Sequence, residues 1–134
     1  RTYFSNSSIA YSINHKPRFL KMLKKPPIIK LTALEVSERL RNLNTTGEWR
    51  LTTFNQVQAI EREMVLKDFE STWAFLTKIA MRAHLMGHHP TLRTTYRNVS
   101  VLLQSHDVGG LSAKDFKLAN KINSYLADSR TNDV

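Results

Sequence analysis

Three of the five histidines in this chain fall within residues 84–90, which read HLMGHHP. Imidazole titrates near neutral pH, so one histidine can donate a proton while another accepts one. A fourth, His106, stands beside Asp107 in the segment SHDVGG. His84 and His88 are also spaced four residues apart, as zinc-binding histidines on one helix face are. These residue types point to acid–base chemistry, to a metal site, or to structural histidines at a helix end.

The three interpretations have unequal support. The zinc-protease pattern places Glu directly after its first histidine, but Leu85 stands there, and the chain has no cysteine that could complete a metal site. One histidine at a helix end needs no further explanation, because it stabilises the helix dipole. Several histidines beside Pro90 or Gly109, at the ends of expected elements where sites are commonly built, favour proton transfer without an essential metal.

Helical and β patterns alternate along the chain. A capping box of Thr32 and Glu35 opens the first expected helix, which ends before Gly47. Strands are expected over residues 49–54 and 57–66, with a turn near Asn55, and then a single strand over 94–105. A last helix opens with a second capping box, Ser112 and Asp115.

The clearest helix runs from an Asp68 N-cap to a stop at Gly87, so the histidine cluster lies at its exit. Its expected buried face consists of Phe69, Trp73, Leu76, Ile79, Ala80 and Ala83. The order of helix, strands, helix, strand and helix lacks a crossover pattern. It predicts an α+β fold, with an antiparallel sheet and its helices on one face.

The positive charge is confined to one end of the chain. Residues 1–30 contain seven of the 20 basic residues and no acid, so the remaining chain is nearly balanced despite a net charge of +9. This distribution argues against nucleic-acid binding by the folded body, and no apolar run is long enough to predict a membrane span.

We expect two parts: a basic, flexible arm over residues 1–30 and one domain over residues 31–134. The arm has the composition of a mitochondrial targeting segment, which predicts the matrix; a basic tail in a cytoplasmic protein is the alternative.

A longer pattern becomes visible when the histidines are combined with Tyr96 and Asp115. The pattern reads His84, three residues, His88-His89-Pro90, five residues, Tyr96, nine residues, His106, eight residues and Asp115. This spacing closely resembles the signature of pterin-4a-carbinolamine dehydratases. These enzymes are also known as dimerisation cofactors of homeodomain transcription factors. The resemblance covers about residues 32–127. Gly87, where Asp or Asn is common, and Thr91-Leu92 depart from it, which puts substrate affinity in question more than chemistry.

The resemblance implies a four-stranded antiparallel sheet with three helices on one face, so that residues 94–105 would split near Arg97 and Asn98. It implies a homodimer or homotetramer, and mainly on this ground we expect a tetramer. An apolar stripe of the last helix supports that expectation: Phe116, Ala119, Ile122 and Leu126. It also implies loss of water from a 4a-hydroxytetrahydropterin to give the quinonoid dihydropterin, a hydro-lyase reaction that uses no cofactor or metal. A non-catalytic coactivator module of the same fold is the alternative.

Site roles follow from the same resemblance. His88 and His106 would be the acid–base pair, and His89 would orient the pterin. Substrate contacts would come from Pro90, Ser105, Asp107 and Val108, and support from His84, Asp115 and Trp49. Two of the supporting roles have structural alternatives. A role as helix cap would be enough to explain Asp115, and Trp49 is equally well explained as a core residue.

Overall fold

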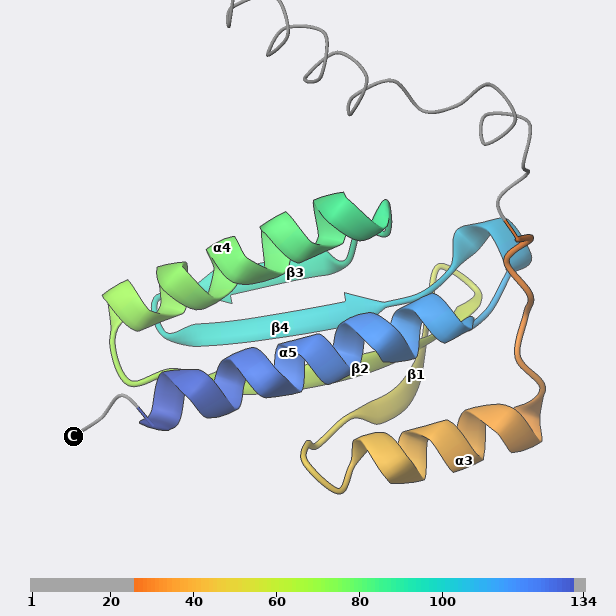
Figure 1. Ribbon diagram of the computed structural model, residues 1–134, viewed down its shortest axis with the longest axis horizontal. Coiled ribbons are helices and arrows are strands. Elements are labelled where there is room, and N and C mark those ends of the chain that lie inside the picture. The colour runs from red at the N-terminus through yellow and green to blue at the C-terminus, as the bar shows by residue number, and fades with distance from the viewer. Residues whose placement is uncertain (1–25, 132–134) are drawn as a thin grey trace, which may run out of the picture.

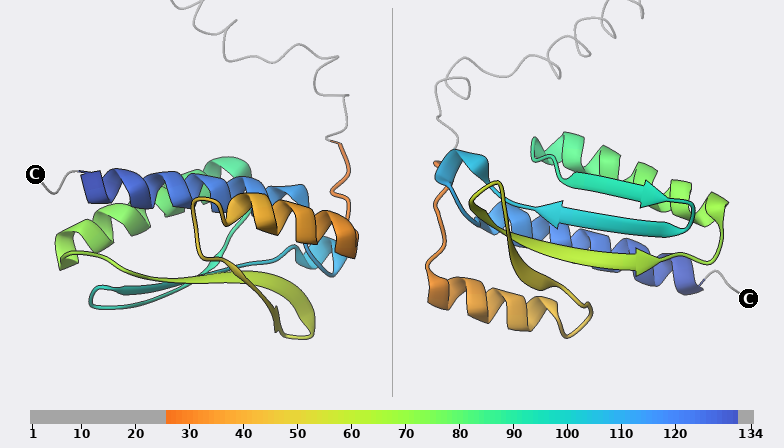
Figure 2. Two further views of the ribbon diagram at one scale, coloured as in Figure 1. Left: turned by 90° about the horizontal axis from the view of Figure 1, so that it is seen from below. Right: turned by 180° about the vertical axis from the view of Figure 1, so that it is seen from behind.

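The computed structural model describes residues 26–131, and this part of the chain forms one antiparallel sheet covered by three α-helices. The strands lie in the order β1-β2-β4-β3, and the helices cover one face of the sheet (Figures 1 and 2). The α+β fold and its four strands are therefore confirmed. The elements are α3 (Ala33–Leu43), β1 (Arg50–Phe54), β2 (Val57–Val65), α4 (Phe69–Met86), β3 (Thr91–Thr95), β4 (Asn98–Leu103), the short 3-10 helix η1 (His106–Val108) and α5 (Ala113–Thr131).

The first hairpin has the two-residue turn expected near Asn55. Phe54 pairs with Val57, and the residues between them, Asn55 and Gln56, have φ of 51° and 66°. Two consecutive positive φ values are typical of a type I′ turn, whose twist matches that of the flanking strands. Glycine is the residue that this turn favours, so Gln56 is held in an unfavourable backbone conformation.

The single strand expected over residues 94–105 is wrong, and the split implied by the family resemblance is right. β3 ends at Thr95, which pairs with Asn98, and Tyr96 takes a left-handed φ of 51° in the turn between them. The Tyr96 ring stacks on Phe69 at 6.3 Å, and the guanidinium of Arg97 lies 5.6 Å from the Tyr96 ring centre. These tertiary contacts stabilise a turn that the β-rich composition conceals.

Helix α4 begins and ends where expected, but its buried face is partly different. The Asp68 carboxylate accepts a hydrogen bond from the Ser71 N–H at 2.6 Å, which makes Asp68 the N-cap. Phe69 and Trp73, expected in the core, are 52% and 49% exposed, and Ala80 is also exposed. The residues that face the core are Thr72, Phe75, Leu76, Ile79 and Ala83. The aromatic pair at the start of α4 therefore belongs to the surface.

The apolar face of helix α5 packs into the core rather than lying at a free surface. The stripe from which a tetramer was expected is buried, with Phe116, Ala119, Ile122 and Leu126 at most 3% exposed. That stripe packs inside one chain, so it cannot serve as a contact between copies.

No helix in residues 26–131 is both long enough and apolar enough to cross a membrane.

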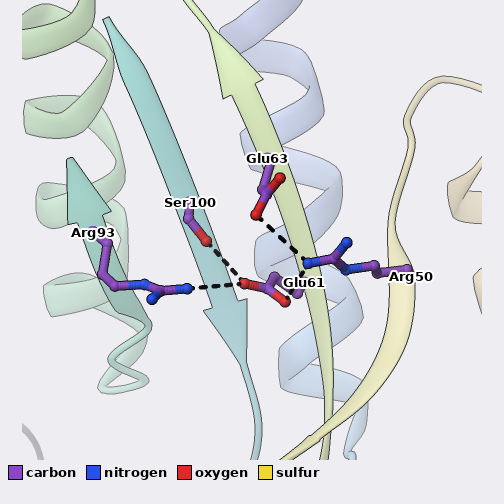
Figure 3. A network of polar contacts seen from close by, with 5 residues as sticks. All are labelled: Arg50, Glu61, Glu63, Arg93 and Ser100. Carbon is purple, nitrogen blue, oxygen red and sulfur yellow. Dashed lines mark hydrogen bonds and ion pairs between the residues drawn. The ribbon is translucent and has the colours of Figure 1, made fainter. Parts of the chain in front are cut away.

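The open face of the sheet carries a polar network that crosses all four strands (Figure 3). Glu61 on β2 is only 7% exposed, and its carboxylate bonds Arg50 on β1 at 3.0 Å and Ser100 on β4 at 3.0 Å. Arg93 on β3 lies 3.4 Å from the same carboxylate. The hydrogen bond from Arg50 is the main reason that the pKa of Glu61 lies below its ordinary value of 4.5.

Candidate active site

Three segments that carry candidate residues meet a fourth segment, the first hairpin turn, at one end of the molecule. They are the exit of α4, the end of β4 with η1, the start of α5, and the β1–β2 turn (Figure 1). Antiparallel pairing explains this, because Thr91 at the start of β3 pairs with Leu102 near the end of β4. Residues just before β3 and just after β4 are thereby brought to the same edge.

His88 is positioned by the way α4 ends. Gly87 adopts φ 61°, its N–H bonds the His84 carbonyl at 3.1 Å, and the His88 N–H bonds the Ala83 carbonyl at 3.1 Å. This pair of bonds is a Schellman motif, which stops the helix and turns the chain. His88 therefore lies beyond the helix and does not share a helix face with His84, as the metal interpretation required.

The His88 imidazole is bound to a buried carboxylate. Its Nε2 lies 2.5 Å from Asp115 Oδ1, and the Asp115 side chain is fully buried. The other oxygen, Oδ2, accepts hydrogen bonds from the Ser105 hydroxyl at 2.7 Å and from the Ser112 N–H at 2.9 Å. The two oxygens of this buried carboxylate thus take part in three hydrogen bonds. The carboxylate holds the proton of His88 on Nε2 and leaves Nδ1 as the nitrogen that can exchange a proton.

Asp115 combines its bond to His88 with a cap at the start of α5. The bond from the Ser112 N–H is half of a capping box at the start of α5. The Ser112 hydroxyl, however, lies 2.7 Å from the Ser105 hydroxyl, and the Asp115 N–H bonds the Ser112 carbonyl at 3.2 Å. The Ser112 side chain thus belongs to the hydrogen-bond network of Asp115 and His88, a role that the sequence did not reveal.

His106 begins a tight loop that is closed at its base. The Ser105 N–H bonds the Gly110 carbonyl at 2.8 Å, and Gly109 takes φ 65° inside the loop. The Val108 N–H bonds the Ser105 carbonyl at 3.2 Å. Substrate contacts were expected from Ser105 and Val108, but their backbone N–H groups hold the loop together. His106 itself is exposed at the loop's start.

Gln104 is a site residue that the sequence analysis missed. Its amide lies 2.9 Å from His106 Nε2. The amide oxygen is assigned to face the imidazole, because its nitrogen then donates to the carbonyls of Phe54 at 3.2 Å and Val57 at 3.3 Å. The signal available in the sequence was a spacing of two residues from His106, since alternate side chains of an extended segment share a face.

The remaining predicted residues differ in their surroundings. His89 and Asp107 directly follow His88 and His106 in the sequence, and both are exposed. Pro90 is half-buried. His84 is exposed on the last turn of α4. Within residues 26–131, no three histidine, aspartate or glutamate side chains gather into a cluster that could hold a metal ion.

Trp49 lies in the core. It is 2% exposed, and its indole N–H donates to Asn123 Oδ1 at 2.7 Å. Asn123 is two turns of α5 beyond Asp115 and also accepts from the buried Arg62 at 2.6 Å. Burial lowers the pKa of Arg62. The structure thus favours the core role for Trp49 over the pocket role.

Comparison with known proteins identifies the family. A family model described as pterin 4 alpha carbinolamine dehydratase matches residues 29–125. The chain belongs to this family. Dehydratases of this kind are hydro-lyases that act on a pterin carbinolamine.

Relatives in the family come from distant organisms. A Saccharomyces cerevisiae protein is 43% identical, over 54% of this chain and 66% of that protein. An Acidobacterium capsulatum protein is 40% identical, over 72% of this chain and 97% of that protein. Both bear the name pterin-4-alpha-carbinolamine dehydratase as a provisional assignment. The Drosophila melanogaster pterin-4-alpha-carbinolamine dehydratase is 36% identical, over 74% of this chain and 50% of that protein.

Two solved structures resemble the fold. A transcriptional coactivator/pterin dehydratase from Brucella melitensis has a TM-score of 0.66 and 32% identity, and covers 73% of this chain and 99% of that one. A pterin dehydratase-like protein described as a RuBisCO assembly factor of the α-carboxysome has a TM-score of 0.51 and 18% identity, and covers 59% of this chain and 89% of that one. The second likeness shows only that the fold is shared.

Proposed function

We propose that this protein removes water from a 4a-hydroxytetrahydropterin by histidine acid–base catalysis. The observation that carries the proposal is the bond from His88 to the buried Asp115 carboxylate, within a chain that belongs to the dehydratase family. In the reaction the carbon–oxygen bond at position 4a breaks, and the hydroxyl leaves as water after gaining a proton. The neighbouring ring nitrogen loses a proton as the new double bond forms. One group must therefore give a proton and another must accept one.

His88 and His106 are the pair that we assign to these two transfers. The Asp115 carboxylate orients His88 and fixes its tautomer, as an aspartate does for the histidine of a catalytic triad. His106 is held by Gln104 and lies next to Ser105, which itself bonds Asp115. His89, exposed beside His88, is assigned to binding the pterin.

Alanine variants of the three histidines test these roles with a synthetic 4a-carbinolamine and absorbance detection. General acid–base groups typically contribute about 10²–10⁴-fold, so His88→Ala and His106→Ala are expected to lower kcat by roughly that factor. His89→Ala is expected mainly to raise KM, because it removes binding common to the ground and transition states. Chelators are expected to leave the rate unchanged. Full activity in all three variants, or activity lost to a chelator and restored by zinc, would contradict this mechanism.

We further propose that the protein is a homo-oligomer assembled through α4. The stripe on α5 is buried, whereas α4 exposes Phe69, Trp73, Met81 and Leu85, the last at 76%. Exposed apolar side chains along one helix are typical of a contact surface, and the family resemblance implies dimers or tetramers.

A matched pair of leucines tests this assembly by light scattering. Leu85→Glu on α4 is expected to lower the oligomer mass, because a charge would be buried in the contact. Leu34→Glu on α3, where the leucine is 79% exposed, is the control and is expected to leave the mass unchanged. A wild-type monomer at micromolar concentration, or equal masses for the two variants, would refute the assembly through α4.

A further inference from the structure

Gln104 connects His106 to the β1–β2 hairpin. Gln104 is only 8% exposed. Its amide lies between the His106 imidazole and the two carbonyls that flank the hairpin turn, those of Phe54 and Val57. With its oxygen toward His106, all three contacts join a donor to an acceptor. With the opposite orientation, the amide oxygen would face two carbonyl oxygens, which cannot form hydrogen bonds.

This orientation has a consequence for the protons of His106. An amide oxygen can only accept, so Nε2 of His106 must carry the proton in their 2.9 Å contact. A neutral imidazole has one protonated nitrogen, so Nδ1 is then the basic nitrogen. The tautomer of His106 is therefore selected by backbone carbonyls of a hairpin more than forty residues earlier in the chain.

The hairpin is held in the conformation that makes this possible. Its turn places Asn55 and Gln56 at positive φ, and neither residue is glycine. The two carbonyls are fixed by the closing pair of Phe54 and Val57. The amide of Gln104 is thus anchored on a rigid element at one side and leaves a single acceptor for His106 at the other.

We propose that Gln104 is a positioning residue: its amide, anchored on the Phe54 and Val57 carbonyls, holds His106 as the Nε2–H tautomer and leaves Nδ1 to exchange the proton in the dehydration. The proposal rests on the proposed function for its catalytic part. The tautomer itself is a property of the protein without substrate. In the reaction, neutral His106 accepts the proton at Nδ1 and becomes an imidazolium, whose Nε2–H remains bonded to Gln104.

Nitrogen-15 NMR of the histidine side chains tests the tautomer directly, with His106→Asn used to assign the signals. In the wild-type protein we expect Nε2 to show the shift of a protonated ring nitrogen and Nδ1 that of an unprotonated one. In Gln104→Met, which keeps the length but has no amide, we expect the shifts to move toward a mixture of tautomers. A predominant Nδ1–H form in the wild-type protein, or unchanged shifts in Gln104→Met, would overturn the assignment.

Kinetics test the catalytic part. Because a neutral hydrogen bond contributes up to roughly tenfold, Gln104→Met is expected to lower kcat by about that factor, with little change in KM. Gln104→Glu keeps an acceptor for Nε2–H and adds a negative charge that favours the imidazolium, so the acidic limb of its pH–rate profile, where the neutral His106 base is lost, should move to higher pH. Gln56→Glu, the same change on an exposed residue of the hairpin turn, is the control and should leave that limb in place.

The outcomes separate the two proposals. The expected tautomer in a protein without dehydratase activity would refute the proposed function and the catalytic role of Gln104, while leaving its structural hold on His106. Activity with an unaffected kcat and pH profile in both Gln104 variants would refute the positioning role alone. Thermal unfolding of each variant shows whether it is folded. If Gln104→Met does not fold, Gln104→Glu provides a second variant for the same test.

Discussion

Asp115 is the residue that joins the elements of the site. Its carboxylate contacts His88 after α4, Ser105 after β4, and the N–H of Ser112 before α5. Its side chain is fully buried, so each of these bonds replaces one that water would otherwise make. Removal of one partner would leave a buried polar group unsatisfied, so we expect the site to be sensitive to single substitutions.

Asp115→Asn keeps the size of the side chain but removes its charge. We expect kcat to fall about 10²-fold, because a neutral amide, which can donate as well as accept, no longer fixes the His88 tautomer. We also expect the free energy of unfolding to fall by about 1–3 kcal/mol, since an NH₂ group would face one of the donors. Steady-state kinetics well below the melting temperature separate the two effects. Glu38→Gln, the same change on the exposed face of α3, should alter neither; an Asp115→Asn enzyme with normal kcat would exclude a catalytic role for this pair.

At the scale of elements, the exit of α4 decides where the histidines point. Gly87 adopts φ 61°, and a Cβ built there would meet no atom within 4 Å. The requirement for glycine is therefore one of backbone conformation and not of space. It also accounts for the departure from the family pattern at this position, because Asp, Asn and Gly all tolerate the left-handed region.

Gly87→Ala tests this interpretation. The left-handed conformation costs a residue with a Cβ roughly 1–2 kcal/mol, so the free energy of unfolding measured in urea should fall by about that amount. Gly87→Asn should cost distinctly less, because asparagine visits this region more readily. Equal losses for the two variants would mean that the Schellman motif is not what limits substitution at this position.

At the scale of the whole molecule, Glu61 connects all four strands on the open face of the sheet (Figure 3). Its pKa is lower in the folded chain than its ordinary value of 4.5, mainly through the hydrogen bond from Arg50. A group with a depressed pKa stabilises the fold above its unfolded pKa. That stabilisation is lost as the pH falls through the folded value.

Glu61→Gln should therefore be less stable than the wild-type protein at pH 7, by about 1 kcal/mol, since both arginine partners are largely exposed to solvent. The difference should shrink below pH 4.5 and vanish once Glu61 is protonated in the folded wild-type protein. Chemical unfolding at several pH values measures this. A difference that stays constant down to the most acidic pH would show that charge is not what Glu61 contributes.

The basic arm is a second feature of the whole chain. Residues 1–25 lie outside the described residues, and the predicted boundary near residue 30 remains a prediction. Leu31 already belongs to the body, because its N–H bonds the Leu111 carbonyl at 2.9 Å. A chain that begins at Lys30 should therefore melt within a few degrees of the full chain in calorimetry. A large loss of stability would show that the arm packs on the domain.

We propose that the same arm directs import into mitochondria, on the basis of its seven cations and absence of acids. Residues 1–30, with any natural sequence that precedes them, would be fused to a fluorescent reporter for the test. Mitochondrial fluorescence is expected, and its loss when the cations are replaced by glutamine is the matched control. A diffuse signal from the intact arm would refute the proposal.

The sequence by itself determined those features that depend on local chemistry. Both caps, Thr32 and Asp68, and the stop at Gly87 were predicted, because capping and left-handed turns depend on residues close together in the chain. The spacing of His88, His106 and Asp115 likewise indicated the family. The fold class followed from the order of the elements.

Only the tertiary structure decided the features that depend on residues far apart. Periodicity placed Phe69 and Trp73 in the core, but the angle at which α4 packs leaves them on the surface and buries Thr72 and Phe75 instead. The bond between Asp115 and His88, and the anchoring of Gln104 on the first hairpin, join segments that no local pattern relates. Proton chemistry depends on distances of about 3 Å between such segments, and only packing of the helices on the sheet sets those distances.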